Sequence, residues 1–321
     1  MTTTSNGLSV VIVNYHSVDY VRRCVADFDS SWCRRLIIVD NSTAASETTA
    51  LQELALGVPF IIITEPENVG FGTAANHGID RALAEDPETP VWLLNPDTEP
   101  APGAPSALLR RLERGSDDIL SPTVITGHAG DRRIWFAGGT ADRSTGNVTH
   151  ANYLEPYRDD SEDGFAPTTF MCGAAPVFTP DAWKALGGFR EDLFLYWEDA
   201  EISLRAQDLG LRMTIAADAV VWHAVGGTGE GSGQSRNFYY YSARNRVSIM
   251  VERHGLRVLL RPRSLVQLLK FSLRPVRRET HEPLIKMLLT VRGYGTGIRL
   301  GRLHTNGPAR RDGTPDRETL A

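Results

Sequence analysis

The chain has 321 residues, of which 41% are hydrophobic and 23% are charged, and its formal net charge is −5. These values are typical of a globular protein, and the negative charge disfavours a general nucleic-acid binder. The 3 cysteines form neither a CxxC metal motif nor a disulfide framework. A polar N-terminus without a signal-peptide pattern, and no apolar run of ~20 residues, favour a cytoplasmic location.

Strands and helices are predicted to alternate in the first part of the chain. Apolar runs of strand length cover residues 8–13, 36–40, 60–63 and 91–94, and helices are expected over 18–28, 46–56 and 72–84. Short connections between such elements indicate an α/β protein with a doubly wound, mostly parallel sheet. Ligands of such sheets bind at the carboxyl ends of the strands, where Asn14, Asp40, Asn68 and Asp97 should gather.

The pattern changes after about residue 115. Residues 115–169 break into short strand-like pieces, which predicts a mixed-sheet region and a variable loop. Helices are expected over 180–186 and 200–209, and a short strand over 211–216. A later apolar run ends at Trp222 and His223.

Arginines alternate with leucine-rich segments from Arg253 to Arg302. This basic amphipathic pattern predicts a C-terminal helical extension over about 251–305, and it leaves two interpretations open. The helices could lie on an anionic membrane surface, or they could pack on the core or on a second copy of the chain. Residues 306–321 are polar and are expected to be disordered.

Glu198 and Asp199 stand at the start of a predicted helix, directly after the apolar residues 194–197. Acidic residues are favoured in a first helical turn, so capping is one interpretation. A carboxylate flanked by large apolar groups is also suited to act as a general base. Asp97 and His223 each follow an apolar run, and each offers a metal ligand.

Several short segments, in their order and spacing, resemble the family two inverting glycosyltransferases, which have the GT-A fold. The segments are VIVNY at 11–15, IIVDNS at 37–42, NVGFGTAAN at 68–76, LNPD at 94–97, WED at 197–199 and WH at 222–223. The third segment, followed by the fourth, is especially similar to bacterial rhamnosyltransferases. WED, WH and YSARN at 241–245 are similar to galactofuranosyltransferases of cell-wall assembly.

The resemblance implies inverting transfer of a sugar from a nucleotide diphosphate donor, dTDP-rhamnose before a UDP-sugar. The acceptor would be a hydroxyl of a carbohydrate or lipid-linked molecule in polysaccharide, cell-wall or glycolipid assembly. It also implies a GT-A domain over 1–250, with a nucleotide-sugar half at about 1–115 and an acceptor half at about 116–250. The extension over 251–305 would follow it.

Residue roles follow from the same resemblance. Asp199 would be the general base, and Glu198 would orient the acceptor or the helix start. Asp97 would bind Mg²⁺ or Mn²⁺ together with His223, although Asn95 replaces the first acid of the family's DxD motif. The donor-binding set would be Asn14, Asp40, Asn68, Gly70, Gly72, Asn76, Asp97 and Arg244.

Three other functions can be compared with this one. A transferase acting on a soluble natural product would use the basic helices as a contact between copies. A catalytically dead binding module is disfavoured because Asp97, Asp199 and His223 are all present. A nicotinamide-binding domain would need GxGxxG directly after the first strand, where the sequence has Asn14-Tyr15-His16-Ser17.

Overall fold

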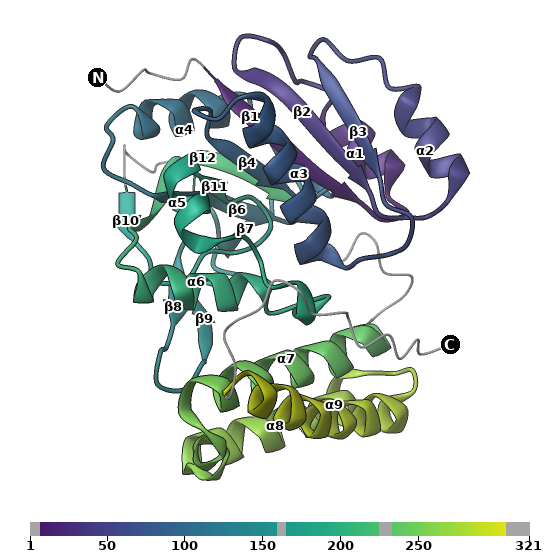
Figure 1. The fold of residues 1–321 in the computed structure, drawn as a ribbon, viewed down its shortest axis with the longest axis vertical. Helices are drawn as coiled ribbons and strands as arrows, with labels where there is room; N and C mark the ends of the chain where they lie inside the picture. Colours follow the sequence, from purple (N-terminus) through teal and green to yellow (C-terminus); the bar gives the residue numbers. More distant parts are fainter. Residues whose placement is uncertain (1–6, 159–164, 225–232, 306–321) are drawn as a thin grey trace.

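The computed structural model describes residues 7–158, 165–224 and 233–305. An α/β body lies against a layer made of the C-terminal helices (Figure 1). The strands of the body form a mixed ten-stranded sheet with the main order β10-β12-β6-β11-β4-β1-β2-β3, while β5 pairs with β12 and β7 with β6. The predicted α/β class is therefore confirmed.

The parallel part of the sheet follows the predicted alternation. It comprises β1 (Leu8–Asn14), β2 (Cys33–Asp40), β3 (Phe60–Thr64) and β4 (Val91–Leu94), connected through α1 (Val18–Cys24), α2 (Ala45–Gln52) and α3 (Phe71–Glu85). Val10 and Ile12 of β1 pack in one core cluster with residues of α1, whereas Val11 and Val13 pack in a second with residues of α3. Helices thus cover both faces, as in a doubly wound sheet.

The second part of the body is a mixed sheet, as expected. Its elements are β5 (Thr98–Pro100), α4 (Ala104–Leu112), β6 (Ile119–Thr126), β7 (Arg133–Phe136), β8 (Gly139–Ala141), β9 (Val148–His150), β10 (Phe165–Pro167), β11 (Val177–Phe178), α5 (Pro180–Leu186), η1 (Glu191–Leu193), α6 (Glu198–Asp208) and β12 (Met213–His223). The strand expected at 211–216 and the later apolar run are one strand, β12, with an irregular register between Ala216 and Val220.

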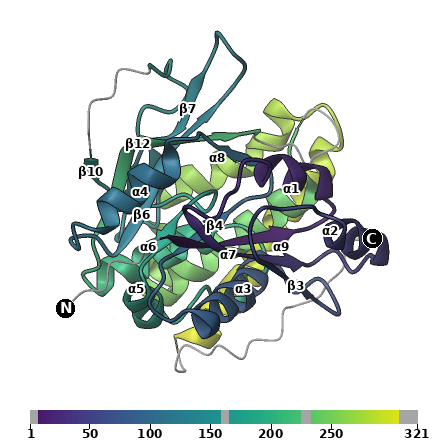
Figure 2. The ribbon, with the colours of Figure 1, turned by 90° about the horizontal axis from the view of Figure 1, so that it is seen from above.

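The C-terminal layer contains α7 (Arg236–His254), η2 (Leu256–Leu260), α8 (Pro262–Arg278) and α9 (Pro283–His304). Seen from above, the sheet lies over α7 and α9 (Figure 2). The domain boundary expected at residue 250 falls within α7, so we propose that α7 is grouped with the extension. No described helix is long and apolar enough to cross a bilayer. The tail predicted at 306–321 lies outside the described residues.

Candidate active site

Asp97 and His223 meet because a short strand follows β4 and returns against β12. In this antiparallel pairing His223 is opposite Thr98, and the amide of Ala224 donates to the carbonyl of Asp97 at 2.9 Å. The Nε2 atom of His223 lies 3.2 Å from Oδ1 of Asp97, and each residue is 8% exposed. The structure thus brings together the two residues predicted to share a metal.

Glu198 and Asp199 open α6 as a partly buried carboxylate pair. The Oδ1 atom of Asp199 accepts the Ala200 amide at 2.7 Å, and Oδ2 accepts the Gly173 amide at 3.3 Å. Burial raises the pKa of Asp199. Burial, together with the charge of Asp199, raises the pKa of Glu198 to about 8, and no described group forms a hydrogen bond with its buried Oε2 atom. Both carboxyl groups therefore hold a proton more readily than ordinary carboxyls.

The two sets of residues are joined by residues 172–174, which the sequence did not point to. Ala174 accepts the Asn95 amide at 2.8 Å, while Gly173 donates to Asp199. Burial, with the charges of Asp199 and Asp97 adding to it, raises the pKa of Cys172 to about 12, so its thiol stays protonated. The LNPD segment and the carboxylate pair therefore border one site.

His150 is a second residue that the sequence did not reveal. Its proximity to Asp199 works against burial by lowering the pKa of that carboxyl, and its Nδ1 atom lies 3.0 Å from the carbonyl oxygen of Trp135. The ring of Trp135 in turn packs edge-on against His223, with centroids 5.9 Å apart. His150 lies in a three-residue strand without any recognisable motif, so only the packing of the β8–β9 hairpin identifies it.

Asp40 lies at the end of β2 and is 0% exposed. Its carboxylate accepts hydrogen bonds from Ser42 Oγ at 2.6 Å, Thr48 Oγ1 at 2.6 Å and Asn14 Nδ2 at 3.2 Å. Burial opposes its ionisation, but these hydrogen bonds outweigh burial and lower its pKa. Asn14 and Asp40 therefore meet, as expected from the adjacent parallel strands, and the contact of Asp40 with a pyrimidine N3–H stays a prediction.

Asn68 and Gly70 form the turn that starts α3. The Oδ1 atom of Asn68 accepts the Gly70 amide at 3.0 Å and the Asn41 side-chain amide at 2.9 Å. Gly70 has a φ of 86°, and a Cβ atom there would lie 2.4 Å from the carbonyl oxygen of Phe194. Glycine is thus required at position 70 both by its conformation and by the close approach of Phe194.

Gly72 and Asn76 contact the same region of the chain from the first turns of α3. A Cβ atom on Gly72 would lie 3.1 Å from the Cβ of Phe189. Asn76 donates to the carbonyl of Phe189 at 2.8 Å and accepts its amide at 2.7 Å. These partners give both residues a structural role in this structure, and their predicted contacts with the donor stay a prediction.

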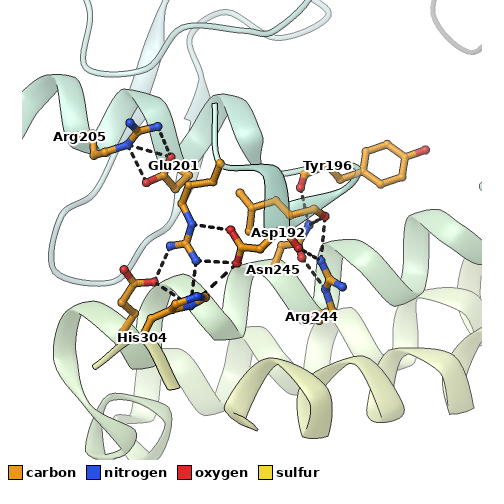
Figure 3. Close-up of polar contacts among 10 residues, drawn as sticks. Asp192, Tyr196, Glu201, Arg205, Arg244, Asn245 and His304 are labelled. Carbon is orange, nitrogen blue, oxygen red and sulfur yellow. Dashed lines mark hydrogen bonds and ion pairs between the residues drawn. The ribbon is translucent and has the colours of Figure 1, made fainter. Parts of the chain in front are cut away.

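Arg244 is 1% exposed, and its guanidinium donates to the carbonyls of Asp192 and Leu193 (Figure 3). A buried guanidinium bound to backbone carbonyls is held away from solvent. We therefore propose that Arg244 supports residues 192–193, in place of the contact with the diphosphate that the sequence predicted.

A divalent cation fits the chemistry of Asp97 and His223, although no group of three or more His, Cys, Asp or Glu residues able to hold a metal occurs in the described ranges. Sites for Mg²⁺ commonly use one or two carboxylates together with substrate phosphates, so two protein ligands are sufficient for a metal that arrives with a diphosphate. The Nδ1 atom of His223 is also buried without a hydrogen-bond partner among those residues.

The site thus combines an acidic residue at the end of β2, an acid and a histidine at the pairing of β5 with β12, and a carboxylate pair at the start of α6. The chain belongs to glycosyl transferase family 2, whose family model matches residues 9–178, more than half of the sequence. This confirms the family expected from the sequence motifs. It leaves open the rhamnosyl or galactofuranosyl specificity.

The chain is also similar to individual known proteins. The chain is 23% identical over 205 residues to the low-salt glycan biosynthesis hexosyltransferase Agl10 of Haloferax volcanii, covering 64% of this chain and 63% of that protein. It is similar to the crystal structure of GalNAc-T7 with UDP, GalNAc and Mn²⁺, with a TM-score of 0.57, 14% identity, and coverage of 78% of this chain and 52% of the other. For residues 1–349 of TarS of S. aureus the TM-score is 0.47, with 15% identity and coverage of 92% and 91%.

Proposed function

We propose that the protein is an inverting hexosyltransferase that moves a sugar from a nucleotide diphosphate donor to an acceptor hydroxyl. The observation that carries this proposal is the position of the Glu198–Asp199 pair, which residues 172–174 connect to the LNPD segment in a family 2 chain. The archaeal relative, named as a hexosyltransferase of glycan biosynthesis, supports a hexose as the transferred group.

Asp199 is the proposed general base. Its raised pKa makes it a better proton acceptor than an ordinary carboxylate, while the amides of Gly173 and Ala200 fix the orientation of its oxygens. Glu198, with a pKa raised to about 8, is protonated at neutral pH and so leaves the negative charge on Asp199. In this mechanism Asp199 takes the acceptor proton as the hydroxyl oxygen attacks the anomeric carbon and the diphosphate departs.

Asp97 and His223 would hold Mg²⁺ or Mn²⁺. When bound, such a cation offsets the negative charge that develops on the departing diphosphate. The residues themselves supply a carboxylate and an imidazole nitrogen that are already 3.2 Å apart. Because the two side chains already lie together, less conformational entropy is lost when the metal binds.

For the donor, we propose dTDP-rhamnose first and a UDP-sugar second, on the resemblance of residues 68–76 and 94–97. Asn14, Asp40, Asn68, Gly70, Gly72 and Asn76 would shape the donor site at the strand ends and at the start of α3. The acceptor would be a carbohydrate or a lipid-linked molecule. We further propose peripheral contact with an anionic membrane through α8 and α9, which expose Leu269 at 60% and Leu288 at 65%.

A panel of nucleotide sugars tests the proposal. Thermal shift with dTDP-rhamnose and several UDP-sugars, with Mn²⁺ or with EDTA, should reveal one donor that stabilises the protein, because a ligand that binds the folded state raises its stability. Release of the nucleoside diphosphate, and the anomeric configuration of the product by NMR, then test transfer and inversion. If no nucleotide sugar stabilised the protein, or if the anomeric configuration were retained, the proposal would be wrong.

A further inference from the structure

Residues 189–197, here named the 189–197 segment, connect the start of α3 to the carboxylate pair. At one end Asn76 forms two hydrogen bonds with Phe189, and further along the Phe71 amide donates to the carbonyl of Phe194 at 2.8 Å. At the other end the segment leads directly into Glu198 and Asp199. The conformation of this segment therefore sets where α6 begins and how both carboxyl groups are presented.

The backbone of the segment is strained. Phe194, Tyr196 and Trp197 have φ values of 63°, 65° and 72°, which residues other than glycine rarely adopt. Strained conformations of this kind persist only where the surrounding structure holds them. The strained conformation should therefore depend on the groups that bind the carbonyl oxygens of the segment.

Asn245 of α7 supplies those contacts. Its Nδ2 atom lies 2.8 Å from the carbonyl oxygen of Leu193, 2.9 Å from that of Leu195 and 2.7 Å from that of Tyr196 (Figure 3). Asn245 is 0% exposed, so water is not available to replace these bonds. The carbonyl of Leu193 also accepts a hydrogen bond from Arg244, so the carbonyls of Leu195 and Tyr196 depend most on this side-chain amide. Unsatisfied buried carbonyl groups are costly, which ties the strained conformation to Asn245.

Helix α9 packs closely against the backbone of α7. Gly293, Gly297 and Gly301 recur every fourth residue along α9, and Cβ atoms on them would lie 2.5 Å from Tyr240 O, 2.2 Å from Arg244 O and 2.5 Å from Ser248 O. The two helices can approach this closely only because these positions are glycine. His304, near the end of α9, also contacts the Arg190 side chain at 3.1 Å (Figure 3).

We infer that Asn245 is a positioning residue for the carboxylate pair, and that α9 acts through α7 to keep it in place. The C-terminal helices thereby hold the 189–197 segment in its strained conformation. The catalytic consequence of this inference rests on the proposed transferase function, whereas the structural coupling does not.

The first test compares Asn245→Asp with Ser248→Ala in the full chain by amide hydrogen exchange. Asp has nearly the same shape as Asn but cannot donate to the three carbonyls. Ser248 is equally buried one turn along α7, and its Oγ atom has no hydrogen-bond partner among the described residues, so it is a matched control. Asn245→Asp should speed exchange in residues 193–201 by about tenfold or more and leave β1 and β4 unchanged, and Ser248→Ala should change neither.

The second test changes α9 and measures the effect on the 189–197 segment. It keeps the inference testable if Asn245→Asp does not fold. Gly297→Ala places a methyl group against the carbonyl of Arg244, whereas a Cβ atom on Gly295 meets nothing within 4 Å. Gly297→Ala should speed exchange in residues 193–201, while Gly295→Ala should not. Exchange that stays at the wild-type rate there, or that rises equally throughout the sheet, would overturn the inference.

Turnover provides the readout that separates positioning from general stability. With a donor found in the panel above, Asn245→Asp should lower kcat by about tenfold or more while the KM for the donor changes by less than about threefold. An equal kcat in variant and wild type would also overturn the positioning role. If exchange changes as expected but the wild-type protein transfers no sugar, the coupling stands and only the proposed function fails.

Discussion

Glu198 and Asp199 have different surroundings although they are neighbours in the chain. Asp199 accepts two backbone amides, whereas the buried Oε2 of Glu198 has no hydrogen-bond partner among the described residues. Hydrogen bonds to a carboxylate favour its charged form, so the negative charge of the pair should reside on Asp199. This asymmetry assigns the base to Asp199 and the protonated partner to Glu198.

Replacement of Asp199 by Asn should abolish most transfer but keep donor binding. The side-chain amide of Asn cannot take up the proton of the acceptor hydroxyl. General-base catalysis typically contributes about 10²–10⁴-fold to the rate. Turnover is measured from release of the nucleoside diphosphate, and affinity for that diphosphate is measured by calorimetry. Glu198→Gln should be milder, and an Asp199→Asn protein with full activity would contradict the assignment.

Replacement of Glu198 by Gln should change how stability depends on pH. The folded state raises the pKa of Glu198 from 4.5 to about 8. Protonated Glu198 therefore stabilises the fold fully below pH 4.5, and this contribution is lost as pH rises through 8. Gln has the shape of the protonated Glu side chain but does not ionise. Between pH 5 and pH 9 the free energy of unfolding of the variant should therefore fall less than that of the wild type, by roughly 1–4 kcal/mol.

Urea unfolding at several pH values measures this difference. Glu53→Gln, at an exposed position at the end of α2, is the matched control and should follow the wild-type curve. Parallel pH profiles for Glu198→Gln and the wild type would show that Glu198 does not titrate in this range.

At the scale of elements, the pairing of β5 with β12 creates the candidate metal site. The antiparallel register sets His223 opposite Thr98, one residue after Asp97. Because β5 has only 3 residues, a small shift of this pairing would separate the carboxylate from the imidazole. The site thus depends on the strand pairing as well as on the two side chains.

Removal of either ligand should weaken the effect of the metal. In Asp97→Ala or His223→Ala, the added stabilisation by Mn²⁺ in the presence of a nucleoside diphosphate should largely disappear, since one of two protein ligands is lost. Thermal shift with Mn²⁺ and with EDTA measures it, and His128→Ala at an exposed position serves as the control. Diphosphate binding that is equally tight with a chelator would exclude this metal-dependent mechanism.

At the scale of the whole molecule, α8 and α9 present apolar and basic side chains on their exposed surfaces. Leu265, Leu269 and Val276 of α8 are exposed beside the exposed basic residues Arg263, Lys270 and Arg277. On α9 the exposed large apolar residues are Leu284, Ile285, Leu288, Val291 and Leu303. Apolar groups with a basic border match the boundary of an anionic bilayer.

Substitution of the exposed leucines should therefore reduce membrane binding. Leu269→Glu combined with Leu288→Glu should lower binding to phosphatidylglycerol vesicles by more than about tenfold, because each buried leucine contributes about 1.5–3 kcal/mol. Flotation at low and high salt measures the binding, which salt should weaken. Leu209→Glu, at a residue 52% exposed at the end of α6, is the matched control.

Two outcomes would contradict this interpretation. Equal binding to neutral phosphatidylcholine vesicles would exclude charge complementarity as its basis. A wild-type protein that does not float, but forms a dimer that the double substitution dissociates, would assign the same surface to a second copy of the chain.

The amino-acid sequence by itself determined the alternation of elements in the body. Buried parallel strands need continuous apolar runs, so β1 and β4 were visible from the hydrophobic pattern alone. The family also followed from local motifs, because a short run such as residues 68–76 encodes a tight turn and a helix start within one segment. The end of the first helix was predicted wrongly: α1 ends at Cys24 and not at Phe28. The apolar pattern continues past the last helical turn, so the pattern alone does not mark where the helix stops.

Only the tertiary structure decided which residues act together. The register of β5 on β12 brought Asp97 to His223, and the β8–β9 hairpin brought His150 to Asp199. The partners of Arg244 and Asn76 were also not visible in the sequence, because a sequence shows a polar side chain but not the distant carbonyl that it binds. Such partners are set by packing between elements far apart in the chain, and no local propensity records that packing.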